Sequence, residues 1–383
     1  MNRMNVRILV HRIPVETPVR TSFGTMYDRP SIAIRIEDGD GHVGWGEVWC
    51  NYPSVGAEHR ARLLESAVLP LAGESGLLDE PEALWEALSA KLRILAIQAG
   101  EPGPLAQCIA GLECALQDLA ARRAGKPLHE HLSQGSGRIV AVYASGINPD
   151  GAAQTAARAV AAGYAGCKVK VGFDRALDRL NLHEVRDVIG ERIALMADAN
   201  QAWSADEAIA FASDVRETGL LWLEEPIAHD QPDADWARIA RETGVVLAAG
   251  ENFSSWNDFE TLPDKRSLGF LQPDIGKWGG LGQGLRVARK AEATGRQFCP
   301  HWLGGGIGLL ASLHLKAAAG AKSGYVEVDF NKNPMRSHVS QSVFDTLSDG
   351  RVTLSESAGL GDLDPVIGDF AGAIVMQKEI AIG

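Results

Sequence analysis

The sequence predicts an α/β protein, a (β/α)7β TIM-like barrel with an N-terminal α+β capping domain. Two observations carry this prediction. The chain has 383 residues, which exceeds the usual size of a single core. From about residue 127, short β-rich runs alternate with Ala-rich helical stretches. Hydrophobic residues make up 45% of the chain and charged residues 22%, so the apolar material suffices for a large core.

The opening segment, residues 1–126, is expected to form the capping domain. Apolar and polar residues alternate over 6–10 and 31–36, and an Asp-Gly-Asp-Gly turn precedes a third such run at 43–48. This pattern predicts an antiparallel meander. Leucines then recur at helical spacing as far as Gly125, so helices are expected to follow the strands.

The second segment, residues 127–344, is expected to form the barrel from eight strands and seven connecting helices. The strands are predicted at 140–145, 166–171, 193–198, 221–224, 246–250, 269–273, 297–300 and 325–328, and the helices at 150–162, 174–189, 204–218, 230–243, 254–261, 280–294 and 307–319. The closing segment, 345–383, shows no further β/α unit. We expect it to pack back on the capping domain.

Charge and cysteine content restrict the partners and the compartment. The formal charge of −12 repels phosphate backbones and anionic membrane surfaces, so we expect neither nucleic acid nor membrane as a partner. The five cysteines form no CxxC pair, and the first 18 residues lack the apolar core of a signal peptide, so we expect a cytoplasmic protein. An anionic substrate would need a local positive centre, such as a metal ion or converging lysines.

Three acids stand at the ends of consecutive predicted strands, where barrel enzymes carry their catalytic residues. Asp198, Glu224 and Glu251 end the third, fourth and fifth strands. Their side chains should converge on one side of the mouth, and three hard oxygen ligands suit Mg²⁺. Asn200 could share the face of Asp198 as a hydrogen-bond partner. A helix cap or a surface charge would explain one such acid, but not three in register.

Two lysines end the second predicted strand. Lys168 and Lys170 are two residues apart, so on a strand their side chains point the same way. Neighbouring ammonium groups near a divalent cation depress each other's pKa, which would let one lysine act as a general base. The alternative is a pair of solvated lysines at a strand end.

Polar residues also end the last three predicted strands. His301 and Asp274 come from neighbouring strands, so the carboxylate can bind one ring nitrogen and fix the tautomer. Glu327 could donate a hydrogen bond to a substrate oxygen if an acid-rich site retains its proton. The alternative for Glu327 is a salt bridge to Arg336 or Lys332.

A glycine-rich run at 306–311 fits the loose dinucleotide fingerprint GxGxxA. Too little chain follows it to build a doubly wound sheet, so a nucleotide fold is excluded. The glycines instead predict a loop at the start of the seventh helix, whose backbone amides could receive an anion.

Six short motifs, taken together in order, resemble the enolase superfamily, and specifically its mandelate racemase subgroup. They are Lys-x-Lys, Asp-x-Asn, Glu-Glu-Pro, Gly-Glu-Asn, Pro-Asp-x-x-Lys and His-Trp, and the resemblance covers essentially the whole chain. The resemblance implies the following roles: Mg²⁺ ligands in Asp198, Glu224 and Glu251, a base in Lys170 assisted by Lys168, and a second base or acid in His301 paired with Asp274.

Two further positions bear on the subgroup. Asp274 resembles the subgroup marker, because the muconate-lactonising branch usually has a lysine there. Glu327 is implied as an additional acid, although Asp329 competes with it because the register of the last strand is open.

The reaction implied by the resemblance is Mg²⁺-dependent abstraction of the proton next to a carboxylate, which gives an enediolate. We expect dehydration of an acid sugar to a 2-keto-3-deoxy acid, with a racemase or epimerase of a 2-hydroxy acid as the alternative. A cycloisomerase is disfavoured by Asp274 and His301. A non-catalytic barrel that binds metal or partner proteins is the alternative of another class, and the presence of every ligand and base argues against it.

The capping domain is implied to supply substrate-selecting loops, which we place at 18–28 and 49–55. Arg20, Tyr27 and Tyr52 are the candidates in these loops for contacting substrate hydroxyls or a distal carboxylate. We also expect the chain to form a homo-oligomer.

Overall fold

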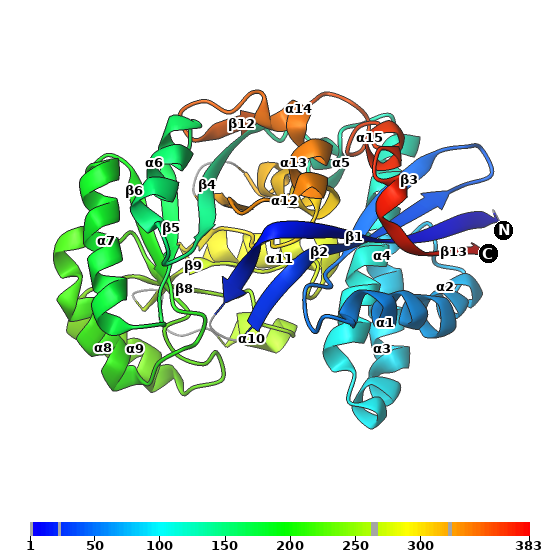
Figure 1. Cartoon of the computed structure of the whole chain (residues 1–383). Helices are drawn as coiled ribbons and strands as arrows, with labels where there is room; N and C mark the ends of the chain where they lie inside the picture. Colours follow the sequence, from blue (N-terminus) through cyan, green and yellow to red (C-terminus); the bar gives the residue numbers. More distant parts are fainter. Residues whose placement is uncertain (1–2, 22–23, 262–266, 321–323) are drawn as a thin grey trace.

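The computed structural model describes residues 3–21, 24–261, 267–320 and 324–383, and it confirms the predicted barrel (Figure 1). Eight parallel strands follow one another around the sheet in the order β10-β9-β8-β7-β6-β5-β4-β11. The amide of Glu327 donates to the carbonyl of Pro300 at 3.4 Å, which brings the last strand against β10. The strands are β4 (Ile139–Ile147), β5 (Gly166–Lys170), β6 (Ala194–Asp198), β7 (Leu223–Glu224), β8 (Leu247–Ala249), β9 (Leu268–Leu271), β10 (Gln297–Phe298) and β11 (Val326–Asp329).

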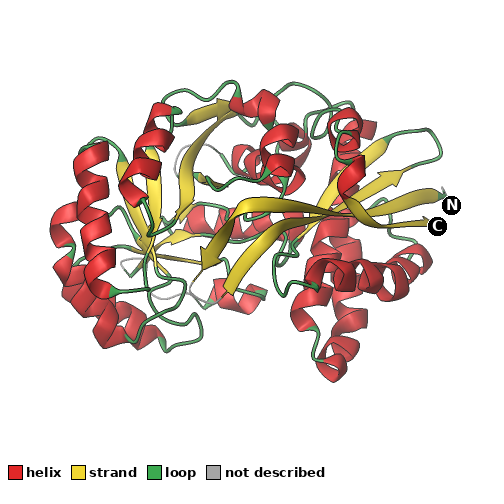
Figure 2. Cartoon of the chain, viewed as in Figure 1, coloured by secondary structure: helices red, strands yellow, loops and turns green. Residues whose placement is uncertain are grey.

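The seven helices that connect these strands form the outer layer (Figure 2). The second of them buries one face, which includes Leu182, Val185 and Ile189, whereas the last is buried along its whole length. The second helix begins where the side chain of Asp174 accepts a hydrogen bond from the amide of Leu177, an N-cap. The helices are α6 (Ala152–Ala161), α7 (Arg175–Ile189), α8 (Ala205–Asp214), α9 (Asp233–Thr243), α10 (Trp256–Glu260), α11 (Gly280–Ala293) and α12 (Gly306–Ala318).

Large side chains fill the inside of the barrel. Strand residues alternate in direction, so one set from each strand points inward. The inward cluster, all buried, consists of Tyr143, Met196, Trp222, Ala248, Phe270 and Cys299. It closes the barrel below the strand ends and forms the floor on which polar side chains can gather.

The capping domain is a four-stranded antiparallel sheet, ordered β13-β1-β2-β3, with helices packed against it. Its strands are β1 (Met4–Thr21), β2 (Gly24–Glu37), β3 (Val43–Val48) and β13 (Ile374–Ile382), and its helices are α1 (Gly56–Leu63), η1 (Leu64–Val68), α2 (Leu69–Glu74), α3 (Pro81–Ala99) and α4 (Pro102–Arg123). The short helix α5 (Leu128–Leu132) leads into the barrel.

The meander was predicted in the right order, but its first two strands are much longer than expected. They stay paired from Asn5 with Glu37 to Thr21 with Gly24. The prediction of a loop at 18–28 is therefore wrong, because most of this segment is a β-hairpin. A register shift between Pro14 and Val19 interrupts the alternation, which hides the continuation of the strand in the sequence.

The last 39 residues divide their contacts between the two domains. The short strand β12 (Arg351–Thr353) pairs antiparallel with β4 of the barrel, whereas β13 pairs antiparallel with β1. Figure 1 shows the two chain ends side by side at the edge of the cap sheet. The other helices described toward this end of the chain are α13 (Pro334–Val339), α14 (Gln341–Phe344), α15 (Asp364–Gly368) and the short η3 (Ala371–Ala373).

Two carboxylates of the capping domain enter helix N-termini of the barrel. Glu113 on α4 accepts hydrogen bonds from the amides of Leu281 and Gly282 at 2.7 and 3.1 Å, at the start of α11. Glu47 on β3 accepts hydrogen bonds from the amides of Gly305 and Gly308 at the start of α12. Anions are favoured at these positions because the first amides of a helix lack internal partners. The anion that the glycine-rich run at 306–311 was expected to receive is thus a carboxylate of the chain itself.

The burial of Glu113 leads to a prediction about stability and pH. Burial raises the pKa of this carboxyl to about 7, although Gln117 and the two amides oppose the shift. Because the folded pKa lies above the unfolded one, protonation favours the folded state, and stability gains as pH falls from about 8 to 5. Glu113→Gln should lose this gain, which amounts to about 3 kcal/mol.

The measurement is the free energy of unfolding of the wild type and of Glu113→Gln at pH 8 and pH 5. The difference between the two proteins should grow in favour of the wild type at the lower pH. A difference that is the same at both values would contradict the assignment of a raised pKa.

Among the described residues, no helix is both long and apolar enough to cross a membrane.

Candidate active site

Three of the predicted site residues lie side by side because the strands are in register. Lys170 pairs with Asp198 between β5 and β6, and Asp198 pairs with Glu224 between β6 and β7. Glu251 follows β8, the next strand of the sheet. Register in a parallel sheet therefore places these side chains in one row across the mouth.

The three acids converge closely enough to hold one ion. Oxygen atoms of Asp198, Glu224 and Glu251 all lie within 4.8 Å of one another, and all three residues are buried. Burial raises the pKa of Glu224, and the charges of the other two acids add to the effect, although Lys168 opposes it. A divalent cation would relieve this repulsion, and carboxylate oxygens are the ligands that Mg²⁺ prefers. The residues present therefore fit Mg²⁺.

Trp222 and Gln272 fix the orientation of Glu224. The indole nitrogen of Trp222 donates to one of its carboxylate oxygens at 3.1 Å, and the amide of Gln272 donates to the same oxygen. Sequence reasoning did not single out either residue. Gln272 could have been noticed, because it is a polar residue inside the predicted strand 269–273.

The two lysines occupy different depths. Lys168 is fully buried, with Nζ bonded to Glu224 and 3.0 Å from Glu327. Lys170 retains 13% exposure of its side chain, and its Nζ donates to Asp198 at 2.6 Å and to Asn200 at 2.9 Å. Lys170 is thus the lysine that faces the open mouth.

The depression of the lysine pKa values was predicted for a site that holds a divalent cation, and it stays a prediction. Without the ion, the facing carboxylates shift both pKa values upward. Burial lowers the pKa of Lys170, but the facing carboxylate of Asp198 outweighs burial and raises it to about 12. The pKa of Lys168 is likewise raised, because Glu224 and Glu327 outweigh its burial. Each ammonium group makes a direct contact with a carboxylate, Lys168 with Glu224 and Lys170 with Asp198, and opposite charges at short range favour the charged form.

His301 and Asp274 form the expected pair. They face each other across a parallel bridge, and Nδ1 of the imidazole lies 2.7 Å from Oδ2 of Asp274. Nε2 points to the acids of the mouth, 2.9 Å from Glu251 and 3.8 Å from Glu327. Burial lowers the pKa of His301, but Glu251 and Glu327 outweigh it, so the pKa is raised well above its usual value.

Glu327 belongs to the mouth, whereas Asp329 does not. Glu327 accepts hydrogen bonds from Tyr143 at 3.0 Å and from Ser145. Asp329 instead pairs with Arg29 and Arg336, at 2.7 and 2.8 Å. The alternative of a salt bridge from Glu327 to Arg336 is therefore wrong.

Retention of a proton by Glu327 also stays a prediction, because the cations around it act against protonation in the ion-free site. Burial raises the pKa of its carboxyl, but Lys168, His301 and Lys170 outweigh burial and lower it. An ionised Glu327 accepts hydrogen bonds and cannot donate one. Lys332, the other partner considered for it, lies 3.0 Å from Glu16 instead.

The candidates for substrate contact are spread over different places. Asn200 is in the mouth, bonded to Lys170. Tyr27 is 73% exposed on β2, which places its ring in solvent rather than against the buried acids. The ring of Tyr52 lies against Gly24 at the end of the hairpin. The side chain of Arg20 lies outside the described part of the chain, although its backbone pairs with Thr25.

A second layer of polar residues surrounds Glu251 and was missed in the sequence. Asn252 donates to Glu225 at 2.7 Å and to Glu251 at 3.2 Å. Lys277 lies 3.2 Å from the side-chain oxygen of Asn252 and 5.3 Å from the ring centre of Trp49 in the cap. The motifs Gly-Glu-Asn and Pro-Asp-x-x-Lys contain Asn252 and Lys277, so a signal was present, but it did not reveal which groups they bind.

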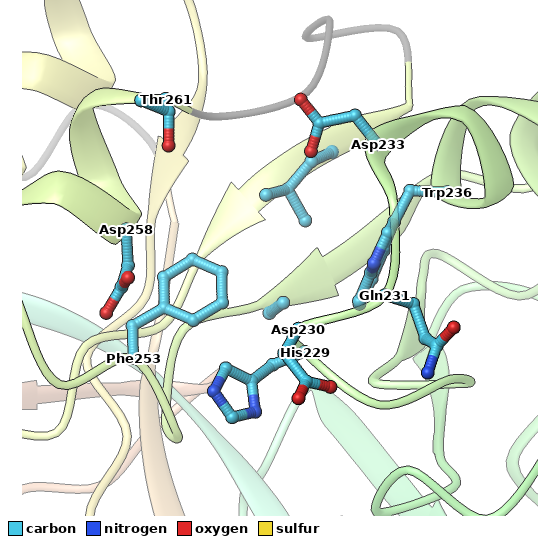
Figure 3. A pocket seen from close by; sticks show the side chains of 10 residues that line it. His229, Asp230, Gln231, Asp233, Trp236, Phe253, Asp258 and Thr261 are labelled. Atoms are coloured by element: carbon cyan, nitrogen blue, oxygen red, sulfur yellow. The ribbon is translucent and has the colours of Figure 1, made fainter.

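A separate pocket lies between α9 and α10 (Figure 3). Its volume is about 240 Å³, and Asp233, Trp236 and Asp258 are among its lining residues. None of the acids and bases described above lines it. The pocket reaches the end of β8 through Ala249 and Phe253, but the carboxylate of Glu251 is not part of its lining.

The fold and the mouth define the class of protein: a barrel that gathers carboxylates, lysines and a histidine–aspartate pair at its strand ends is an enzyme scaffold. A family model described as "Enolase C-terminal domain-like" matches residues 151–362, and the "Mandelate racemase / muconate lactonizing enzyme, N-terminal domain" matches residues 3–133. The chain belongs to the enolase superfamily, in its mandelate racemase subgroup.

Curated relatives carry several activities. An arabinonate dehydratase of Saccharolobus solfataricus is 29% identical over 341 residues, covering 86% of this chain and 87% of that protein. A 3,6-anhydro-alpha-L-galactonate cycloisomerase of Streptomyces coelicolor is 33% identical over 305 residues, covering 77% of this chain and 81% of that protein. The chain is therefore an enzyme, a lyase or an isomerase, and the non-catalytic alternative is set aside.

Solved structures agree with this membership. A mandelate racemase/muconate lactonizing enzyme from Bordetella bronchiseptica RB50 is 46% identical with a TM-score of 0.87, covering 97% of this chain and 100% of that one. A racemase from Streptomyces coelicolor A3(2) with bound magnesium is 28% identical with a TM-score of 0.81, covering 97% of this chain and 99% of that one.

Proposed function

We propose that this enzyme is a Mg²⁺-dependent acid-sugar dehydratase that removes the proton next to a carboxylate and expels a β-hydroxyl as water. The observation that carries the proposal is the placement of two candidate bases on strands β5 and β10. These strands are separated by β4 and β11 on one side of the barrel and by four strands on the other. Lys170 and His301 can therefore act on a substrate from different sides.

Asp198, Glu224 and Glu251 would hold the ion. When bound, Mg²⁺ supplies positive charge that favours the carboxylate substrate and the negative charge that develops on it during proton removal. Dehydratases and a magnesium-bound racemase among the relatives support this assignment.

The chain's own groups would perform the proton transfers. Lys170 would act in its neutral form, and positive charge held by the three acids would favour that form by lowering the pKa that Asp198 and Glu251 otherwise raise. Its Nζ takes the α-proton, and the electron pair of the C–H bond moves onto the carboxylate to give an enediolate. The enediolate then expels the β-hydroxyl, which leaves as water with a proton from His301. The resulting enol tautomerises to a 2-keto-3-deoxy acid. Asp274, 2.7 Å from Nδ1, stabilises the protonated imidazole that donates this proton.

A second candidate function is racemisation or epimerisation of a 2-hydroxy acid. The same two bases favour it, since one base can remove a proton and the other can return one to the opposite face. Cycloisomerisation is a further alternative, because a relative at 33% identity is named a cycloisomerase.

The test is a screen of mono- and diacid sugars, their lactones and simple 2-hydroxy acids with the Mg²⁺-loaded enzyme in heavy water. Formation of a keto acid supports dehydration. Exchange or inversion of the α-proton without a keto acid supports racemisation, and opening or closing of a lactone ring supports cycloisomerisation. If no acid in the screen exchanges its α-proton, the proposed proton abstraction fails.

A further inference from the structure

The two loops that carry His301 and Asp274 are also the loops that the capping domain binds. Asp274 lies in the connection from β9 to α11, and His301 lies in the connection from β10 to α12. Glu113 caps α11 and Glu47 caps α12, so each of these connections is held at both ends. One end is a barrel strand, and the other is a carboxylate of the cap.

Glu47 makes three hydrogen bonds although its side chain is buried. It accepts from the amides of Gly305 and Gly308 at 2.6 and 2.9 Å and from the hydroxyl of Ser31 at 2.8 Å. A Cβ atom at residue 305 would lie 2.5 Å from Oε1 of Glu47, so only glycine permits this approach. The contact therefore depends on matched residues in both domains.

Trp302 couples the two loops to each other. It follows His301 directly, and its indole nitrogen donates to the carbonyl of Gly305 at 2.8 Å. A Cβ atom at residue 276, in the loop of Asp274, would lie 2.4 Å from this indole. The ring is thus packed tightly between the loops, so a shift of residue 305 moves the indole and the neighbouring histidine together.

The chain beyond Glu47 contacts the same loops. Asn51 donates to the carbonyl of Leu303, and Trp49 lies against Lys277. These residues follow β3 directly, in the segment 49–55 that the sequence suggested for substrate selection. One strand of the cap therefore leads from the loops of the histidine–aspartate pair to the rim of the mouth.

We propose that Glu47 is a positioning residue for the His301–Asp274 pair. It acts by fixing the start of α12 and, through Trp302, the loop before it. Glu113 fixes the start of α11 in the same way. The effect should be confined to the His301 side of the mouth. Lys170 is on β5, and the contacts of Glu47 and Glu113 described above do not involve this strand. The functional part of this inference rests on the proposed proton abstraction.

The experiment compares Glu47→Gln with the wild type in the Mg²⁺-loaded protein. Two readouts require no substrate: hydrogen exchange of the backbone amides in 301–310, and the ¹⁵N resonances of the His301 imidazole, assigned with His301→Asn. We expect amide exchange at residues 305 and 308 to accelerate at least tenfold, and the imidazole resonances to shift as the bond to Asp274 is perturbed.

The third readout is the α-proton exchange of an acid found in the screen and of its epimer at the α-carbon. We expect the exchange handled by His301 to fall about 10- to 100-fold, and the exchange handled by Lys170 to stay within about threefold. Glu65→Gln is the matched control, because Glu65 pairs with Lys378 at 3.0 Å on the outer side of the cap. It should leave all three readouts unchanged.

Ser31→Ala provides a milder variant in case Glu47→Gln does not fold, since it removes one hydrogen bond to Glu47 and leaves the barrel intact. Unchanged imidazole resonances, or an equal fall of exchange on both faces, would overturn the positioning role. If the wild type exchanges no α-proton from any acid, the proposed function fails, and the two substrate-free readouts still decide the inference.

Discussion

Substitution of Lys170 by methionine is expected to lower α-proton exchange from the substrate face that this lysine serves by at least about 10³-fold. The reason is geometric. Lys170 is the lysine that faces the open mouth, whereas Lys168 is fully buried against Glu224. Methionine keeps the length and the apolar stem of the side chain but carries no group that can accept a proton. Lys168 therefore cannot substitute for the missing base.

The comparison that makes this result specific is His301→Asn. If both residues are bases on opposite faces, each variant should lose exchange on its own face and retain it on the other. Dehydration needs both the base and the acid, so both variants should lose formation of the keto acid. Exchange is measured by proton NMR in heavy water with the two epimers at the α-carbon separately.

Lys332→Ala serves as a control for the loss of a positive charge near the mouth. Lys332 is 80% exposed and pairs with Glu16, so its removal should change the rates by no more than about twofold. Equal exchange rates on both faces in Lys170→Met would remove this lysine from the mechanism and leave the site without its first base.

The barrel could be predicted from the sequence because each of its units repeats the same pattern. A short β-rich run followed by an amphipathic helix recurs seven times, and the pattern sets the number of strands and crossovers. The acids were predicted for the same reason. Asp198 and Glu224 stand at the ends of adjacent strands, and register in a parallel sheet places such residues side by side.

What the sequence could not provide was the partner of each charged group. Lys168 and Lys170 were expected to depress each other's pKa because their spacing is visible in the sequence. Their carboxylate partners, Glu224 and Asp198, come from other strands, and at short range these partners dominate. The surroundings of Glu327 were hidden for the same reason, because its proximity to Lys168 emerges only from the fold.

The contact between the domains was hidden in a similar way. The glycines near residue 306 predicted amides that receive an anion, but nothing in the local pattern indicated Glu47, about 260 positions earlier. The length of the cap hairpin was obscured by the register shift after Pro14. In both cases the determining interaction joins segments that are distant in sequence, and such pairings are beyond the reach of periodicity.

Neutralising Asp198 is expected to abolish the response of the protein to Mg²⁺. Asp198→Asn keeps the size of the side chain and removes one of three buried charges whose oxygens lie within 4.8 Å of one another. In the wild type, Mg²⁺ at 100 times its dissociation constant should stabilise the folded state by about 2.7 kcal/mol, because the folded site binds the ion and the unfolded chain does not. The variant should show little of this stabilisation and should lose turnover by several orders of magnitude.

The measurement is the unfolding temperature of each protein in EDTA and across a Mg²⁺ titration. The matched control is Asp40→Asn, which belongs to a second group of possible ligands, Asp38, Asp40 and His42, at the turn before β3. In this group, Asp38 already pairs with the guanidinium of Arg123 at 2.7 Å. The positive charge of Arg123 would repel a divalent ion. Asp40→Asn should therefore keep the full Mg²⁺ response. If the control loses the response and Asp198→Asn keeps it, the ion binds at the hairpin turn, and the acids of the barrel mouth would need another explanation.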